Sequence, residues 1–182
     1  MKKIFLSVLC LFTVYLLNAQ SQFGIISYSL PQGWYARQSG NDLELVKKGD
    51  DNSGCKITLF QQVNTLVNDE KKFIQLWALK TKTGSTKTAS PIKTEDNGWI
   101  SFSGFKTTGK GTTTEGFYTV CDGSQTAIIL AEAQENSCIN EINSILASIT
   151  IPAKETRSKA KAKPASKKVR VLPLKSLKAL VN

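Results

Sequence analysis

Short apolar runs separated by turn residues dominate the chain between residues 87 and 133. Asn97-Gly98 and Asp122-Gly123 interrupt these runs, and Gly109-Lys110-Gly111 lies between them. Asn-Gly and Asp-Gly are strong hairpin signals, because both central residues of a type I′ turn need a positive φ. The pattern predicts four antiparallel strands. The last one, Ala127-Ile128-Ile129-Leu130, is apolar at consecutive positions and is expected to be buried on both faces.

Further strands are predicted before this meander, over residues 23–30, 43–46 and 55–60. Pro31 and Gly33 predict a turn after the first of them, because Pro presets φ and Gly accepts a positive φ. This turn carries Trp34 into the core. The polar segment 49–54 predicts a hairpin between the other two, with Cys55, Ile57 and Leu59 on one face.

Two amphipathic helices complete the pattern. The first is predicted from an N-cap at Asn68 to about residue 82, with one buried stripe formed by Phe73, Leu76, Trp77 and Lys80. The second is predicted after an N-cap at Asn136, with a stripe formed by Ile139, Ile142, Leu146 and Ile149. Pro152 is expected to end the folded body. The chain is therefore predicted to be an α+β domain, in which two hairpin or meander halves form one antiparallel sheet and the two helices cover it.

The first nineteen residues have the pattern of a secretory signal peptide. Lys2-Lys3 precede an uncharged, mostly apolar run over residues 4–17, and small residues follow it. This run is shorter than the roughly 20 residues that span a bilayer, which argues against a membrane anchor. Cys10 follows Leu9 inside the run, which argues against a lipoprotein. We expect export to the periplasm or the extracellular space.

The signal cleavage region is predicted at Ala19, Gln20 and Ser21. Cleavage after Ala19 places the unsuitable Leu17 three positions before the cut, whereas cleavage after Ser21 places Ala19 there. The site is therefore placed between residues 19 and 22. The domains that follow are a folded unit over 22–152 and a tail over 153–182.

The net charge of +10 belongs mainly to that tail. Residues 20–153 carry twelve Lys/Arg and thirteen Asp/Glu, whereas residues 154–182 carry ten Lys/Arg and one Glu. A nucleic-acid-binding domain would carry its positive charge on the folded surface, so no nucleic-acid partner is expected. The low-complexity tail is predicted to be disordered, with a short amphipathic end from Leu174. Its candidate contacts with a protein, an anionic membrane or a cell-wall surface are Lys159, Lys161, Lys163, Lys167, Lys168 and Arg170.

Three cysteines remain after removal of the signal: Cys55, Cys121 and Cys138. A strand separates Cys121 from Cys138, and at about 3.3 Å per residue its two ends lie roughly 30 Å apart, so these two are not expected to bond. A disulfide from Cys55 to either of the others stays open. The favoured interpretation is three small, buried apolar residues.

The chain contains no histidine, which removes the commonest general base and both Ser-His-Asp and Cys-His nucleophilic systems. The cysteine spacing forms no C-x-x-C motif. Gly109-Lys110-Gly111-Thr112 resembles the end of a P-loop, but the preceding spacing is wrong and a hairpin turn is favoured. Asp50-Asp51-Asn52-Ser53-Gly54 lacks the alternating ligands and the closing Glu of an EF-hand calcium loop and favours a turn, as does Glu95-Asp96. No catalytic, cofactor-binding or metal-binding residue is predicted.

Several of these segments together resemble the PsbP/Mog-type fold. They are the motif Tyr28-Ser29-Leu30-Pro31-Gln32-Gly33-Trp34, the strand Lys56-Ile57-Thr58-Leu59, the helix with Phe73 and Trp77, and the closing helix that ends at Ile149. The resemblance covers roughly residues 24 to 152. It implies a binding or assembly module without catalytic activity, and no site residues are transferred from it.

Three functional hypotheses follow. The first is an exported, non-catalytic accessory or binding module for an unknown protein or envelope component. The second is an envelope-associated protein docked to an anionic surface or partner through its basic tail. The third is a small hydrolase that uses two carboxylates, which would need a deep cleft that a domain of this size seldom builds. Trp34 and Trp77 are expected in the core, with Trp99 more open.

Overall fold

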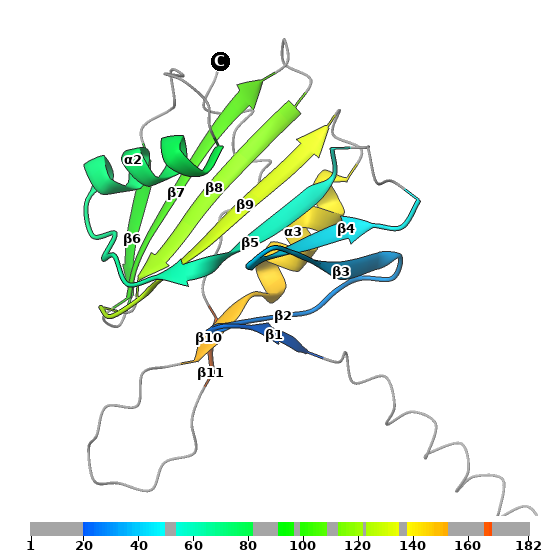
Figure 1. The fold of residues 1–182 in the computed structure, drawn as a ribbon, viewed down its shortest axis with the longest axis horizontal. Coiled ribbons are helices and arrows are strands. Elements are labelled where there is room, and N and C mark those ends of the chain that lie inside the picture. The colour runs from blue at the N-terminus through cyan, green and yellow to red at the C-terminus, as the bar shows by residue number, and fades with distance from the viewer. Residues whose placement is uncertain are drawn as a thin grey trace, which may run out of the picture.

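The largest element of the fold is an antiparallel sheet of seven strands. The computed structural model describes residues 20–49, 54–81, 91–96, 99–108, 113–121, 123–134, 138–152 and 166–168. The seven strands are β3 (Trp34–Ser39), β4 (Asp42–Lys47), β5 (Lys56–Val63), β6 (Ile92–Asp96), β7 (Trp99–Thr108), β8 (Thr113–Cys121) and β9 (Thr126–Gln134). Their order is β3-β4-β5-β9-β8-β7-β6, and every neighbouring pair is antiparallel (Figure 1).

The meander predicted from the turn residues is confirmed as β6 to β9, which form one half of this sheet. The strands β3, β4 and β5 form the other half and pair with the meander through β9. Consecutive residues of β9 belong to different cores: Ile129 faces one of them, whereas Ile128 and Leu130 face the other. The prediction that this strand is buried on both faces is therefore confirmed.

A second, smaller sheet lies beside the first. Its four antiparallel strands are β1 (Ser21–Phe23), β2 (Ile26–Tyr28), β10 (Thr150–Pro152) and β11 (Ser166–Lys168), in that order. The single strand predicted over residues 23–30 is therefore wrong. Gly24, with φ of +57°, reverses the chain between β1 and β2, a conformation that costs glycine little because it has no Cβ.

The strand β11 lies inside the tail that the sequence predicts to be disordered. Ser166–Lys168 pairs with Thr150–Pro152, so that prediction does not hold at these three residues. The rest of 153–182, including the amphipathic end predicted from Leu174, lies outside the described residues.

The two predicted helices exist, but both caps were predicted at the wrong residue. Asp69, not Asn68, caps α2 (Glu70–Thr81), because its Oδ1 accepts a hydrogen bond from the backbone N–H of Lys72 at 2.8 Å. In α3 (Ile139–Ser148) the cap position is Cys138, which makes no side-chain capping bond. Asn136, the predicted cap, lies outside the described residues.

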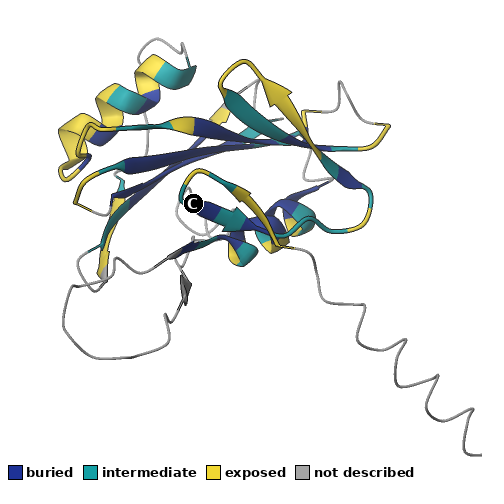
Figure 2. Cartoon of the chain, turned by 60° about the horizontal axis from the view of Figure 1, so that its bottom comes forward, coloured by how far each residue is buried: buried dark blue, intermediate teal, exposed yellow. Residues whose placement is uncertain are grey.

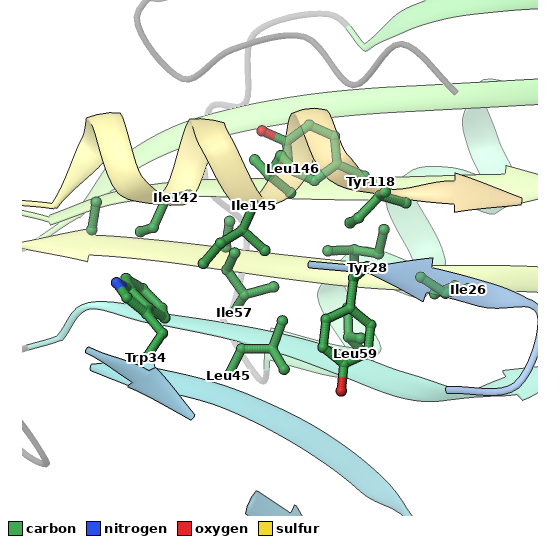
Figure 3. Packing of buried hydrophobic residues seen from close by; sticks show 14 of the residues in the cluster. Ile26, Tyr28, Trp34, Leu45, Ile57, Leu59, Tyr118, Ile142, Ile145 and Leu146 are labelled. Carbon is green, nitrogen blue, oxygen red and sulfur yellow. The ribbon is translucent and has the colours of Figure 1, made fainter. Parts of the chain in front are cut away.

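The helices cover opposite faces of the large sheet, and each face has its own core (Figures 1 and 2). On one face, Ile142, Ile145 and Leu146 of α3 point towards the strands of the sheet (Figure 3). On the other face, Phe73 and Trp77 of α2 pack on residues of β5, β7, β8 and β9. The predicted α+β class is confirmed.

The turn at Pro31 fixes α3 to the edge of the sheet. The backbone N–H of Trp34 donates to the carbonyl of Pro31 at 3.2 Å, and Gly33 has φ of +85°. The buried Trp34 then donates its indole N–H to Glu141 Oε2 at 3.4 Å, and Lys47 Nζ lies 3.0 Å from Glu141 Oε1. The predicted turn and the predicted burial of Trp34 are both confirmed.

A disulfide joins Cys55, at the start of β5, to Cys138, at the start of α3. The interpretation of three unbonded cysteines is therefore wrong, whereas the pair Cys121–Cys138 is correctly excluded. Cys121 is a buried free thiol on β8. The sequence separation of 83 residues means that the bond closes a long loop around most of the sheet.

Candidate functional site

One face of the large sheet is covered over only part of its width. The helix α2 crosses β6, β7 and β8 and reaches Phe60 in the second half of β5. No helix or strand of the described chain lies over β3, β4 and the first half of β5 on that side (Figure 1). Side chains alternate along a strand, and the register places one set of side chains on this uncovered part. We call it the open face, and its residues are Tyr35, Arg37, Glu44, Val46, Lys56, Thr58 and Glu132. Val46 and Thr58 are buried beneath their neighbours, so the exposed part of the face is formed by the other residues.

Four charges of alternating sign run across the open face. Arg37 Nε lies 2.8 Å from Glu44 Oε2, and Lys56 Nζ lies 3.6 Å from Glu44 Oε1 and 3.2 Å from Glu132 Oε2. Because each charge has an oppositely charged neighbour, the row holds these long side chains in place. The Arg37 and Lys56 side chains nevertheless remain 44% and 34% exposed, so their charges stay accessible to solvent.

The charged row continues under α2 as a buried ion pair. Glu115 lies opposite Glu132 in the register of β8 and β9, and opposite Lys106 in the register of β7 and β8. Lys106 Nζ is 2.8 Å from Glu115 Oε1, and the two side chains are 2% and 9% exposed. The indole N–H of Trp77 donates to the same oxygen at 2.6 Å. Buried charges are tolerated when they are paired and hydrogen-bonded, so this contact fixes α2 on the sheet.

Aromatic contacts set the edge of the open face where α2 ends. A Cβ on Gly104 would lie 2.4 Å from the Trp77 ring, so only glycine allows this close approach. Trp77 stacks on Phe117, with ring centroids 5.6 Å apart. Lys80 Nζ lies 4.6 Å from the centroid of Phe60, which confirms that the Lys80 stem continues the apolar stripe of α2.

Among the described residues, the pKa values of Tyr28, Asp69 and Tyr118 are shifted. Burial raises the pKa of Tyr118, which packs edge-on against Phe105, and burial also raises the pKa of Tyr28. The hydrogen bond from the backbone N–H of Lys72 lowers the pKa of Asp69. All three groups lie outside the open face.

Two opposed carboxylates on the α2 side of the sheet, Glu115 and Glu132, are each engaged by a lysine. Glu115 and Glu132 are the closest match to the two carboxylates of the hydrolase hypothesis, because they lie opposite each other in the sheet. Lys106 binds Glu115 beneath α2, and Lys56 binds Glu132. The arrangement is better suited to electrostatic contact with a partner than to proton transfer.

The structure places few of the residues singled out from the sequence. Gln20 and Ser21 of the cleavage region lie at the start of the small sheet, and Ala19 lies outside the described residues. Among the candidate tail contacts, Lys167 and Lys168 belong to β11. The residues that lie outside the described ones are Lys159, Lys161, Lys163 and Arg170, with the turn residues 50–53, 97–98 and 109–112.

An uncovered surface of the sheet can be expected from the sequence, but the residues that form the open face cannot be named from it. Arg37, Glu44 and Lys56 each occupy a polar position in the alternating pattern of a strand, but the three strands are different. They form one row only through the register of those strands, which the sequence does not specify.

The described ranges contain no candidate metal site and no candidate membrane-spanning helix. No group of three or more His, Cys, Asp or Glu side chains within them could hold a metal ion. Among the helices in those ranges, none is both long and apolar enough to cross a membrane.

Comparison with known proteins found similar chains among the solved structures. No family model and no curated protein matches the chain. A crystal structure of a Bacteroides thetaiotaomicron protein is 11% identical with a TM-score of 0.42, over 72% of this chain and 51% of that one. The chain therefore spans about half the length of that protein. The Ran-binding protein Mog1p of Saccharomyces cerevisiae is 9% identical with a TM-score of 0.47, over 74% of this chain and 95% of Mog1p.

Proposed function

We propose that the mature chain is an exported, non-catalytic binding module that contacts a protein partner through its open face. The observation that carries this proposal is the row of alternating charges from Arg37 to Glu132, which lies on the part of the sheet beside α2 (Figure 1). Complementary charge patterns steer partners together and fix their register. A rigid sheet presents such a pattern with little loss of side-chain entropy on binding.

The chemistry of the chain supports binding over catalysis. The sequence has no histidine, and the two opposed carboxylates on the α2 side of the sheet, Glu115 under the helix and Glu132 on the open face, are each held by a lysine. Tyr35 adds an aromatic ring at the edge of the face, and tyrosine is enriched in protein interfaces. These features give the face both polar specificity and some apolar area.

The disulfide Cys55–Cys138 supports export. Such bonds persist in the periplasm and outside the cell, and are rare in the cytosol, where thiols are kept reduced. The lysine pair and apolar run at the N-terminus point the same way.

A matched pair of charge reversals tests the role of the open face. Arg37→Glu changes a charge on this face, whereas Lys71→Glu makes the same change of net charge at an exposed position of α2. Each mature protein would be used to capture partners from its own cell envelope, with quantitative mass spectrometry as the readout. We expect partners of the wild type to be lost with Arg37→Glu and kept with Lys71→Glu. Equal capture by both variants would contradict the proposal.

A second candidate function is association with an anionic envelope surface through the tail. It is favoured by the concentration of ten Lys/Arg and one Glu in residues 154–182. Basic residues near an anionic membrane each contribute about 1 kcal/mol before screening by salt. The test compares sedimentation of the mature protein and of its 154–182 deletion with anionic vesicles and with cell-wall material. Equal sedimentation of the two proteins would exclude this role for the tail.

A further inference from the structure

The first described residues of the chain are part of the folded domain. Gln20 Nε2 donates a hydrogen bond to Thr150 Oγ1 at 2.9 Å, which joins residues 130 positions apart in the sequence. Ser21 is the first residue of β1 and lies opposite Tyr28 in the β1–β2 ladder. A side-chain hydrogen bond between Ser21 and Tyr28 also lowers the pKa of Tyr28 against the larger effect of burial.

These contacts distinguish between the bonds at which the signal peptide could be cut. Cleavage after Ala19 keeps Gln20 and Ser21. The mature chain then retains all of β1 and the hydrogen bond from Gln20 to Thr150 of β10. Cleavage after Ser21 removes the hydrogen bond to Thr150, the first rung of the β1–β2 ladder and the side-chain partner of Tyr28. Only two residues of β1 would then remain.

We propose that the signal peptidase cuts the Ala19–Gln20 bond, so that the mature chain begins at Gln20. The proposal rests on the proposed export. This cut leaves Leu17 three positions before the cleaved bond. It is preferred because Gln20 and Ser21, which a cut after Ser21 would remove, both contact residues of the small sheet. Peptide-bond hydrolysis by the host peptidase adds one water, which leaves a carboxylate on Ala19 and an ammonium on Gln20. That ammonium lies next to β1, at an exposed position.

The full chain would be produced in a bacterial host that has a general secretory pathway, and recovered from the periplasm or the medium. Tandem mass spectrometry of the N-terminal peptide then identifies the first residue. We expect Gln20-Ser21-Gln22. A chain that begins at Ser21 or at Gln22 would overturn the proposed bond and leave export intact. An uncut chain retained in the cytoplasm would contradict both export and the proposed bond.

Two matched variants test the same bond from the side of the peptidase. Ala19→Leu places a large residue directly before the proposed cut, whereas Ser21→Leu places the same residue before the alternative cut. We expect Ala19→Leu to abolish formation of the Gln20 end, and Ser21→Leu to leave it in place. The opposite result would overturn the proposal. The readout is the N-terminal residue, so it does not require the variants to be as stable as the wild type.

A comparison of two purified chains tests the structural reason. We expect the chain that begins at Gln22 to unfold at a lower denaturant concentration than the chain that begins at Gln20, because it lacks the contacts to Thr150 and Tyr28. Equal unfolding midpoints would remove the argument from the small sheet.

Discussion

The two faces of the large sheet are built from different interactions. The face under α3 is apolar and is closed by the helix, the small sheet and the disulfide Cys55–Cys138. The face under α2 carries an aromatic cluster, a buried ion pair and the charged row of the open face. The α3 face therefore resembles an ordinary core, whereas the α2 face keeps polar groups at a stability cost that a purely structural face would avoid. This difference places the candidate function on the α2 face.

The largest effect on stability is expected from removing the disulfide Cys55–Cys138 on the α3 face. The double change Cys55→Ala and Cys138→Ala opens a loop with a sequence separation of 83 residues. In the loop-entropy description, the lost constraint on the unfolded chain should lower the free energy of unfolding by about 4.5 kcal/mol. Urea unfolding of the oxidised wild type and of the variant measures it. Cys121→Ala, a change at a buried free thiol, is the control and should cost much less. Similar losses of unfolding free energy in both variants would contradict the expected contribution of the disulfide to stability.

On the α2 face, the largest effect is expected from breaking the buried pair. Lys106→Met leaves Glu115 charged and without its cation under α2, which should cost about 3–5 kcal/mol. A second variant, Lys106→Met with Glu115→Leu, removes both charges and should recover most of the loss. Denaturant unfolding of both variants and of the wild type checks this. If the double variant is no more stable than Lys106→Met, the cost comes from packing and not from the unpaired charge.

Adding one methyl group to each face compares how tightly the two are packed. Gly104→Ala places a Cβ 2.4 Å from the Trp77 ring, and Gly116→Ala places one 2.7 Å from the Tyr118 hydroxyl oxygen. Both substitutions should cost about 1–3 kcal/mol through overpacking. Only Gly104→Ala should also speed amide hydrogen exchange in α2, because it pushes against that helix. Faster exchange of α2 in Gly116→Ala would show that the two faces are not independent.

The overall fold could be predicted because its signals are local. Turn residues such as Asn97-Gly98 mark the hairpins, and the spacing of Phe73 and Trp77 marks a buried helix face. Some errors arise where two neighbouring residues could fill one role. Asn68 and Asp69 are both good caps, and only the position of the first helical turn decides between them.

The candidate site depends on contacts between distant strands, so it could not be predicted in the same way. Lys106 and Glu115 look like surface residues in the sequence, because nothing local shows that α2 covers them. The disulfide is a similar case. Cys55 and Cys138 are brought together by the pairing of β5 with β9, and the sequence left the partner of Cys55 open.

A pH-dependent effect is expected from the phenol buried on the α3 face. Burial raises the pKa of Tyr118 above its ordinary value of 10.0, so its stabilising contribution is fully present below pH 10 and is lost as the pH rises further. The folded state then loses about 1.4 kcal/mol for each pH unit above 10 relative to the unfolded state. Unfolding measured from pH 8 to 11 should show this decline, and Tyr118→Phe should weaken it. An unchanged slope in Tyr118→Phe would assign the decline to other groups, such as Tyr28, whose pKa is also raised.

The smallest effect on stability is expected from a Lys-to-Met change on the open face. The same type of change should be costly at Lys106 under α2. Lys56→Met removes the cation between Glu44 and Glu132, as Lys106→Met does for Glu115. Lys56 is 34% exposed, so water solvates the remaining carboxylates and the cost should stay below about 1 kcal/mol. Capture of envelope partners should nevertheless fall, because the open face loses the centre of its charged row. A variant as unstable as Lys106→Met would show that the row holds the sheet together, whereas a stable variant with reduced capture would separate binding from folding on one face of the same sheet.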